Sequence, residues 1–480
     1  MKKSFCLLLF AVLLFSCGQK PAPQPVGPVP NQHQLQWHDM EYYAFLHFSM
    51  NTFTDQEWGD GSNPASVFNP TDLDADSWAK TCVEAGMKGI IITAKHHCGF
   101  CLWPSAYTEY SVKNSPWKDG KGDIVKDLSE ACKKYGLKLG VYLSPWDRNH
   151  AQYGSPEYIT YFRNQLTELL TQYGDVFEVW FDGANGGDGW YGGASETRRI
   201  DNKTYYDWPN TIAMVRSIQP NAILFSDGGP DIRWCGNEKG YVGETNWCLQ
   251  KAGAFMPGVA DNSILETGLE DGDCWCPAEV DVSIRPGWFY HQSEDSRVKT
   301  PSQLMGIYLT SVGRGSNLIL NIPIDLRGRF DDRDTASLLE FGQRLRQSFQ
   351  NDLLSDARFK ADVSRGRGYE PANLKADDET YYAAPDGVQN VEITSTLPQA
   401  ASMNAVVLKE TISLGQRVGA FTLEARVDGE WKQVAEGTTI GHKRILSFPE
   451  VKADALRLKV TKSKDCPVLS FMGAYLAQID

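Results

Sequence analysis

Residues 176–186 read VFEVWFDGANG, an apolar run that ends abruptly in an acid and a glycine-rich turn. Valine and aromatic residues fill the run, which is typical of a strand that is buried on both faces. Asp182 follows Trp180 and Phe181, and Gly183 opens the turn. Because a carboxylate at the end of a buried strand is costly to desolvate, the pattern indicates either a functional acid or an aspartate that caps the turn.

Four more apolar runs have the same form, each followed by polar residues and turn formers. They cover residues 89–94, 137–143, 222–225 and 318–322. Helical patterns at 77–85, 124–135, 156–173 and 205–219 precede or separate them. Strands that alternate with helices predict an α/β fold with a parallel sheet.

We expect this sheet to close into a (β/α)₈-like TIM barrel over residues 35–350. Polar groups follow at least five of the strands, and barrel enzymes build their active face at the C-terminal ends of the strands. An open, doubly wound sheet also places ligands at that edge, so it is the alternative.

The pattern changes after the barrel, where residues 351–480 predict an all-β sandwich. Short alternating runs replace the helices, at 391–394, 403–408, 421–427, 431–434, 455–460 and 468–471. Turn formers separate these runs, and FTLEARVDGEW (421–431) indicates a hairpin. The module resembles the galactose-binding-like, discoidin-type sandwiches found beside many glycosidases.

Size and charge narrow the class of protein. The chain has 480 residues, 42% of them hydrophobic and 22% charged, which suits a globular protein of two or more domains. A net charge of −13 argues against a nucleic-acid partner, which needs a basic face. The sequence contains neither a Walker A loop nor a dinucleotide-binding fingerprint.

The first residues predict export. Lys2 and Lys3 precede a short apolar run, and Cys17 follows Ser16 as in a bacterial lipobox. We expect residues 1–17 to be a lipoprotein signal peptide, with lipid on Cys17 and the protein anchored to a membrane in the bacterial periplasm or at the cell surface. An ordinary signal peptide with an incidental cysteine is the alternative. Residues 18–34 are rich in proline and predict an extended tether.

Eleven cysteines raise the question of a metal or of disulfides. Cys98 and Cys101, next to His96 and His97, invite a zinc interpretation, as does the distant pair Cys274 and Cys276. Structural zinc sites usually show two ligand pairs with C-x₂₋₄-C spacing, and the second pair here has a one-residue gap. Buried thiols or a disulfide are therefore favoured, and we expect no metal and no cofactor.

A second carboxylate is needed if Asp182 works as a catalytic group. Glu238 ends the segment GPDIRWCGNE (229–238), which follows the next strand along the chain. Two carboxyl groups above a barrel are what glycoside hydrolysis requires: one protonates the leaving oxygen and the other meets the anomeric carbon. Asp227, Asp231 and Glu244 are rivals for the second position, and spacing alone does not choose among them.

Histidine and aromatic residues gather near the same strand ends. His47 ends an apolar run, and His96 and His97 follow another. A neutral imidazole both donates and accepts, which suits vicinal hydroxyls, although a lone histidine is more often a core residue. Glu57, Trp58, Tyr142, Trp146, Trp180 and Trp288 lie beside polar turns, where a flat ring could carry a sugar.

Six segments in order resemble the α-L-fucosidases of glycoside hydrolase family 29: FLHFSMNTF (45–53), KHHCGF (95–100), VWFDG (179–183), GPDIRWCGNE (229–238), RPGWFYH (285–291) and VGRGSNLILNIP (312–323). The fourth and fifth resemble the branch that prefers α-1,3/1,4-fucosyl linkages. The resemblance implies a retaining double displacement on fucosylated glycans, with Asp182 as nucleophile and Glu238 as acid/base. It implies fucose contacts from His47, Glu57, Trp58, His96, His97, Tyr142 and Trp180, and places Trp288 near the substrate.

Two positions depart from the family pattern. Cys98 stands where the family usually has aspartate, and Ile324 replaces the second proline of NIPPD. Neither departure removes a catalytic group, but Cys98 puts the hydrogen bonding beside the histidine pair in doubt. Another retaining barrel glycosidase, such as an α-galactosidase, is the alternative among enzymes. A surface lipoprotein that binds glycans without turnover is the alternative among other classes.

Overall fold

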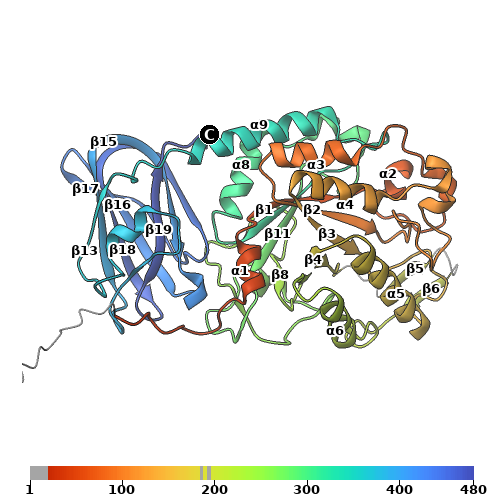
Figure 1. The fold of residues 1–480 in the computed structure, drawn as a ribbon, viewed down its shortest axis with the longest axis horizontal. Coiled ribbons are helices and arrows are strands. Elements are labelled where there is room, and N and C mark those ends of the chain that lie inside the picture. Colours follow the sequence, from red (N-terminus) through yellow and green to blue (C-terminus); the bar gives the residue numbers. More distant parts are fainter. Residues whose placement is uncertain (1–19, 184–187, 192–195, 480) are drawn as a thin grey trace, which may run out of the picture.

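The computed structural model describes residues 20–183, 188–191 and 196–479. Its first domain is a closed barrel of eight parallel strands (Figure 1), in the order β1-β12-β11-β8-β7-β4-β3-β2. These are β1 (Tyr42–Leu46), β2 (Gly89–Lys95), β3 (Lys138–Leu143), β4 (Val176–Trp180), β7 (Ile223–Ser226), β8 (Ile232–Trp234), β11 (Ala278–Ser283) and β12 (Asn317–Asn321). The predicted barrel is confirmed, and the open sheet is wrong.

Helices cover the outside of the barrel. They are α2 (Met50–Thr54), α3 (Ala75–Glu84), α4 (Ile124–Tyr135), α5 (Pro156–Gln172), α6 (Trp208–Ile218), α7 (Asn262–Leu265), α8 (Pro301–Thr310) and α9 (Asp332–Phe349). Helix α4 has the bounds that the sequence predicts, because Asp123 caps its first turn and Gly136, with a φ of 74°, ends it.

Alternate residues of each strand serve two cores, because side chains of a strand point to opposite faces in turn. In β1, Tyr42 and Ala44 pack outward under the helices, whereas Tyr43 and Phe45 point into the barrel. Helix α1 (Gln32–His38) covers the N-terminal end, where Trp37 joins the inner core. Since both faces are buried, the strands are apolar runs rather than alternating ones.

One step of the barrel lacks the usual helix. Only residues 227–231 separate β7 from β8, and the two strands pair directly, with Phe225 opposite Ile232. The sequence analysis assigned no strand to β1, β8 or β11. Two short hairpins, β5 (Asp188–Tyr191) with β6 (Glu196–Arg199) and β9 (Leu249–Gln250) with β10 (Cys274–Trp275), lie outside the barrel.

The second domain is an antiparallel sheet with its own core. Its strands are β13 (Arg358–Ala361), β14 (Tyr382–Ala383), β15 (Val391–Glu410), β16 (Val418–Val427), β17 (Glu430–Gly437), β18 (Arg444–Ser463) and β19 (Val468–Tyr475). The predicted hairpin is confirmed as β16 and β17. Asp428 and Gly429 join them, and both have the positive φ that a tight two-residue turn of this kind requires.

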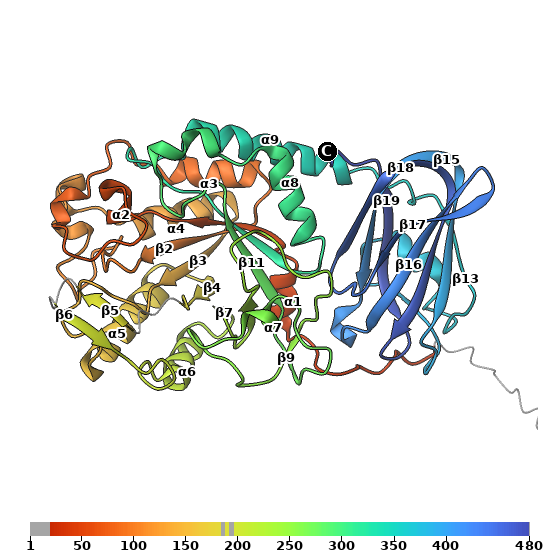
Figure 2. The same ribbon diagram turned by 180° about the vertical axis from the view of Figure 1, so that it is seen from behind.

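The two domains share a buried boundary (Figure 2). Val407, Ile445 and Phe471 of the β-domain belong to the same hydrophobic cluster as the outer barrel core. Polar contacts reinforce the boundary: the side chain of Gln416 accepts from the backbone N–H of Cys248 at 2.7 Å and donates to the carbonyl of Asn246 at 2.8 Å.

The segment before α1 runs along the β-domain (Figures 1 and 2). Arg365 donates to the carbonyl of Pro21 at 2.8 Å, and Arg417 donates to that of Gln24 at 2.6 Å. Helix α1 begins at Gln32, within the range expected for the tether. Cys17 lies outside the described residues. Within them, no helix has both the length and the apolar character that crossing a membrane would need.

Nine cysteines fall within the described residues, and all are free thiols. A disulfide among them is therefore not formed. Cys98 lies 3.2 Å from the hydroxyl of Ser49, and Gln165 donates to Cys101 at 3.2 Å. Among the described residues, no three histidine, cysteine, aspartate or glutamate side chains are grouped so that they could hold a metal ion.

Candidate active site

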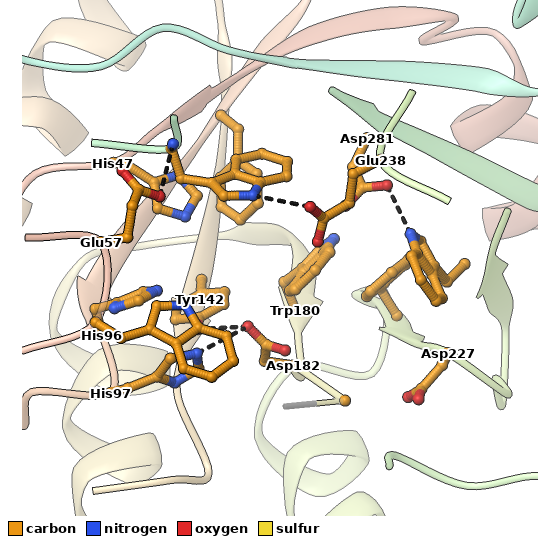
Figure 3. Close-up of a pocket in the computed structure, with 16 residues that line it drawn as sticks. His47, Glu57, His96, His97, Tyr142, Trp180, Asp182, Asp227, Glu238 and Asp281 are labelled. Carbon is orange, nitrogen blue, oxygen red and sulfur yellow. Dashed lines mark hydrogen bonds and ion pairs between the residues drawn. The ribbon is translucent and has the colours of Figure 1, made fainter. Parts of the chain in front are cut away.

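A cavity of about 310 Å³ opens at the C-terminal ends of the barrel strands (Figure 3). Its volume suits a small ligand. Ten residues singled out from the sequence line it: His47, Glu57, Trp58, His96, His97, Tyr142, Trp180, Asp182, Glu238 and Trp288. They come from segments spread over more than half of the chain, and the closed barrel brings them together because all its strands end on one side.

Asp182 lines this cavity, two residues after the end of β4. Tyr142 of β3 donates its hydroxyl proton to Oδ2 at 2.7 Å, which fixes the orientation of the carboxylate. The Asp182 side chain is 21% exposed, so it is neither sealed in the core nor open on the surface. Gly183 follows because any Cβ there would lie 2.3 Å from Oδ2 of Asp227.

Glu238 projects into the same cavity from the loop after β8 (Figure 3). Burial raises the pKa of its carboxyl, the negative charge of Glu57 raises the pKa further, and a hydrogen bond from Trp288 opposes both. That bond runs from Nε1 of Trp288 to Oε2 at 3.2 Å. A glutamic acid with a raised pKa is suited to begin a reaction as a proton donor.

Three histidines on one side of the cavity are neutral. Burial lowers the pKa of His47 and of His97 to about 3, and it lowers the pKa of His96 well below the usual range. Repulsion from a proton on a neighbouring histidine disfavours protonation of His96 and of His97 further, and the charge of Arg148 also lowers the pKa of His97. Although Nε2 of His97 lies 3.7 Å from Oδ2 of Asp182, the pair is therefore not an ion pair. Neutral imidazoles can serve as both donors and acceptors for ligand hydroxyls.

Asn321 at the end of β12 orients His47, and the sequence analysis did not single it out as a site residue. Its Oδ1 lies 2.8 Å from Nδ1 of His47, and its amide donates to the carbonyl of Trp288 at 2.9 Å. Because Oδ1 only accepts, the proton of His47 is on Nδ1. Nε2 of His47 is therefore an acceptor.

Aromatic rings form the rest of the wall. Trp180 stacks on Phe225 with ring centres 4.0 Å apart, and its Nε1 donates to Glu279 at 2.8 Å, beneath the cavity. The indole thus presents ring surface, and not its N–H, to a ligand. Trp58 is 55% exposed and covers His97 edge-on. Trp146 does not line the cavity but packs against His97.

Glu57 lines the cavity, yet its carboxylate also has structural partners. It accepts backbone N–H groups from Trp288 at 2.9 Å and from Phe289 at 3.0 Å, and it lies 2.7 Å from Nε2 of His291. Glu57 therefore joins the loop after β1 to the loop after β11 that carries Trp288.

The structure places two of the three rivals for the second carboxylate away from the cavity and one inside it. Asp231 pairs with Arg216 and accepts the backbone N–H of Leu224, away from the cavity. Glu244 pairs with Arg444 at the domain boundary, at 2.6 Å. Asp227 does line the cavity; burial raises its pKa to about 6, and the N–H of Gly258 is 3.1 Å from both its oxygens.

A fifth carboxyl in the cavity, beside Glu57, Asp182, Asp227 and Glu238, was not anticipated. Asp281 of β11 is buried and accepts from Nε1 of Trp234 at 2.7 Å. Burial and the nearby Glu238 raise the pKa of Asp281 well above its usual range. Phe45, Phe225 and Trp234 also line the cavity without having been singled out. In AEVDVS (278–283) acidic residues alternate with valines, as in a strand with one polar face. This alternation is the signal that could have revealed Asp281.

Cys98 leaves the histidine pair in place despite its departure from the family pattern. The thiol is buried, and burial raises its pKa to about 11, so it is not ionised at neutral pH. His97 is held by Ser144 and not by Cys98. Nδ1 of His97 lies 2.7 Å from the Ser144 hydroxyl, which itself donates to the carbonyl of Trp146.

A barrel mouth that gathers an oriented carboxylate, a second carboxyl with a raised pKa, neutral histidines and exposed aromatic rings defines a glycoside hydrolase. The comparisons with known proteins narrow this class. A family model described as alpha-L-fucosidase matches residues 27–348. The chain belongs to the α-L-fucosidase family, glycoside hydrolase family 29, and it is an enzyme of that activity.

Relatives cover nearly the whole chain, including the β-domain. "Alpha-L-fucosidase 1" of Arabidopsis thaliana is 42% identical over 466 residues, which span 95% of this chain and 89% of the relative. A solved glycoside hydrolase 29 family member from an unknown rumen bacterium is 49% identical with a TM-score of 0.85, over 95% of this chain and 78% of its own. A putative α-L-fucosidase from Bacteroides thetaiotaomicron is 39% identical with a TM-score of 0.88, over 96% and 100%.

Proposed function

We propose that this protein is an exo-acting, retaining α-L-fucosidase that removes terminal α-1,3/1,4-linked L-fucose from oligosaccharides or glycoconjugates. Asp182 is the nucleophile and Glu238 the acid/base. The observation that carries this proposal is the meeting of both carboxyls in one cavity, with Asp182 oriented by Tyr142 and the pKa of Glu238 raised.

The reaction then proceeds in two displacements. The Asp182 carboxylate attacks the anomeric carbon while Glu238 gives its proton to the glycosidic oxygen, so that the glycan leaves as an alcohol. Glu238, now ionised, takes a proton from water as the water oxygen attacks the same carbon. The bond to Asp182 breaks, and fucose is released with its original anomeric configuration.

The surroundings suit L-fucose, which has three ring hydroxyls and a methyl group in place of a hydroxymethyl group. His47, His96 and His97 can exchange hydrogen bonds with the hydroxyls. Phe45 packs 5.1 Å from Trp180, and the two rings with Phe225 give a wall whose one N–H, Nε1 of Trp180, is engaged by Glu279. A methyl group fits such a wall better than a hydroxyl would.

Chemical rescue tests the two assignments separately. We expect Asp182→Ala and Glu238→Ala each to lose about 10²-fold or more of kcat on an aryl fucoside, the second because hydrolysis of the intermediate lacks its base. Azide should restore the first variant with release of β-fucosyl azide, because it attacks the face that Asp182 has left. It should restore the second with α-fucosyl azide, formed from the covalent intermediate. Near-normal activity in either variant would refute its assignment.

The linkage preference rests on the loops that carry Glu238 and Trp288. Segments 229–238 and 285–291 resemble the α-1,3/1,4 branch, and they meet at the hydrogen bond between those two side chains. A panel of fucosylated oligosaccharides tests this preference. We expect branched α-1,3- and α-1,4-linked glycans to be cleaved faster than α-1,2- or α-1,6-linked ones. Rapid cleavage of simple aryl fucosides with no action on branched glycans would contradict it.

We also infer that Cys17 carries lipid and holds the enzyme on a bacterial membrane, in the periplasm or at the cell surface. Its lipobox-like setting supports this, and residues 20–31 would bring the anchor to the β-domain side of the molecule. Replacing Cys17 by serine should move the protein from the membrane to the soluble fraction. Unchanged membrane association would argue against the anchor.

A further inference from the structure

His291 bridges two acids at the edge of the cavity. Its Nδ1 lies 2.5 Å from Oδ1 of Asp55, and its Nε2 lies 2.7 Å from Oε1 of Glu57. An ionised carboxylate only accepts hydrogen bonds, so both ring nitrogens donate and the ring is an imidazolium. Burial alone would lower the pKa of His291, but the hydrogen bonds and charges of the two acids outweigh burial and raise it.

Glu57, which contacts His291, also binds the backbone of the loop that carries Trp288. Its two carboxylate oxygens accept the backbone N–H groups of Trp288 and Phe289, at 2.9 and 3.0 Å. The indole of Trp288 in turn donates to Glu238 at 3.2 Å. In Figure 3, dashed lines that end on Glu57 and on Glu238 mark the last two of these hydrogen bonds. Hydrogen bonds to Glu57, and then from the backbone and the indole of Trp288, thus connect His291 to the proposed acid/base.

The rest of the loop is held independently of His291. Arg285 makes a buried pair with Asp334 at 2.8 Å, and Asn321 donates to the carbonyl of Trp288. Arg285 also contacts the carbonyl of His291 at 3.4 Å, and Glu294 accepts the N–H of Gly287 at 3.0 Å. The loop therefore has anchors that can keep it folded when the His291 contact is removed.

Packing leaves little freedom beside the bridge. A Cβ on Gly287 would lie 2.6 Å from Oε1 of Glu57 and 3.1 Å from Cδ2 of His291. The carboxylate of Glu57 is thus confined between the imidazolium and the backbone of residues 287–289. A cationic donor beside Glu57 holds that carboxylate turned toward the two backbone N–H groups.

We propose that His291, held between Asp55 and Glu57, is a positioning residue for the acid/base step. It acts through Glu57 and Trp288 on Glu238, and it does not touch the substrate. This inference rests on the proposed role of Glu238 as the acid that protonates the leaving group. Loss of the bridge should therefore impair proton donation more than it impairs binding or attack by Asp182.

Leaving-group dependence tests the proposal. An activated aryl fucoside needs little protonation, whereas an unactivated fucosyl disaccharide needs the acid. For His291→Phe, which keeps a ring but removes both donors, we expect kcat/KM to fall about tenfold on the disaccharide, the scale of one charge-assisted hydrogen bond. On the aryl fucoside the same variant should keep at least about half of the kcat/KM of the parent enzyme. Activity at that level would also show that the variant is folded. Equal losses on both substrates would overturn the proposal.

A double-mutant cycle adds a second readout. If His291 acts through Trp288, the variant with both His291→Phe and Trp288→Phe should be no worse on the disaccharide than Trp288→Phe alone. If the fold-losses in kcat/KM of the two single variants multiply in the double variant, His291 does not act through Trp288. Asp60→Asn is the matched control, because Asp60 lies in the same loop as Asp55 but accepts hydrogen bonds from Ser62. This replacement should leave kcat/KM on both substrates unchanged.

Glu238→Gln separates the two proposals. If this variant loses kcat/KM on the disaccharide but keeps kcat/KM on the aryl fucoside, while His291→Phe loses kcat/KM equally on both, the inference about His291 fails and the role of Glu238 stands. If Glu238→Gln loses kcat/KM equally on both substrates, Glu238 is not the acid, and the proposed function fails at that residue.

Discussion

In the proposed mechanism Glu238 is protonated when the substrate binds, so its ionisation would set the alkaline limit of the reaction. Burial and the charge of Glu57 raise the pKa of its carboxyl, and the hydrogen bond from Trp288 lowers it. As the pH rises through the resulting value, the enzyme loses its acid and kcat/KM should fall. Trp288 thus tunes this limit as well as holding the carboxyl in place.

Trp288→Phe should shift that limit to higher pH. The change deletes the indole N–H whose hydrogen bond favours ionised Glu238, so the pKa of the carboxyl rises further. The maximal rate on unactivated substrates should fall at the same time, because the carboxyl is less well positioned. A pH profile of kcat/KM measures both effects. An alkaline limb that moves to lower pH would contradict this account of Trp288.

Some residues that line the cavity could be predicted from local sequence, because they stand where an apolar run meets a turn, whereas Glu57, Trp58 and Trp288 were expected there mainly from the family resemblance. Asp182 and the pair His96 and His97 are examples. The partners of these residues could not be predicted. That Glu57 binds backbone N–H groups 231 and 232 positions away depends on how two loops pack, which no local pattern encodes.

At the scale of single elements, β4 and β11 carry a second acidic pair deep in the barrel. Glu178 and Glu279 point inward below the cavity, and Tyr43 contacts both. Burial raises the pKa of both carboxyls, and their mutual repulsion raises that of Glu178 further. Glu279 also accepts from Trp180, so the pair supports the wall of the active site.

This pair should make stability depend on pH. A carboxyl whose pKa is raised by folding is ionised in the unfolded chain first, so the folded state loses stability as pH rises above the ordinary glutamate value of about 4.3. Glu279→Gln keeps an acceptor for Trp180 but cannot ionise. Thermal unfolding at pH 5 and pH 8 should therefore show a smaller loss of stability in the variant than in the parent enzyme. An equal loss of stability in the variant and the parent enzyme would mean that the pair does not titrate between pH 5 and pH 8.

Elements with inward acids explain where the strand prediction failed. In β11, Glu279 and Asp281 alternate with Val280 and Val282, so the strand does not appear as an apolar run. Strand β8 has three residues and follows β7 after a short link, which leaves no periodicity to detect. Long runs such as β2 and β4 were found because both of their faces meet apolar neighbours.

At the scale of the whole molecule, the β-domain is part of one folded unit with the barrel. Gln416 is buried next to the shared hydrophobic cluster. Its side-chain amide hydrogen-bonds the backbone N–H of Cys248 and the backbone carbonyl of Asn246. The composition predicted two domains but could not predict this boundary, since its contacts join residues about 170 positions apart.

Gln416→Leu should destabilise both domains together. Leucine has a similar size but leaves one buried N–H and one buried carbonyl without partners, a loss of about 2 kcal/mol or more. Calorimetry should show a single unfolding transition at a lower temperature than that of the parent enzyme. Two separate transitions, with the barrel unaffected, would show that the domains are energetically independent.

The central claim is that Asp182 forms a covalent bond to fucose. A 2-deoxy-2-fluoro-L-fucosyl fluoride slows both displacements but leaves the activated first one faster, so the intermediate accumulates. Peptide mass spectrometry of the inactivated enzyme should find one fluorofucosyl group, on Asp182, and unmodified Glu238. A label on Glu238, Asp227 or any other residue, or turnover that first releases β-fucose from a natural substrate, would contradict the account.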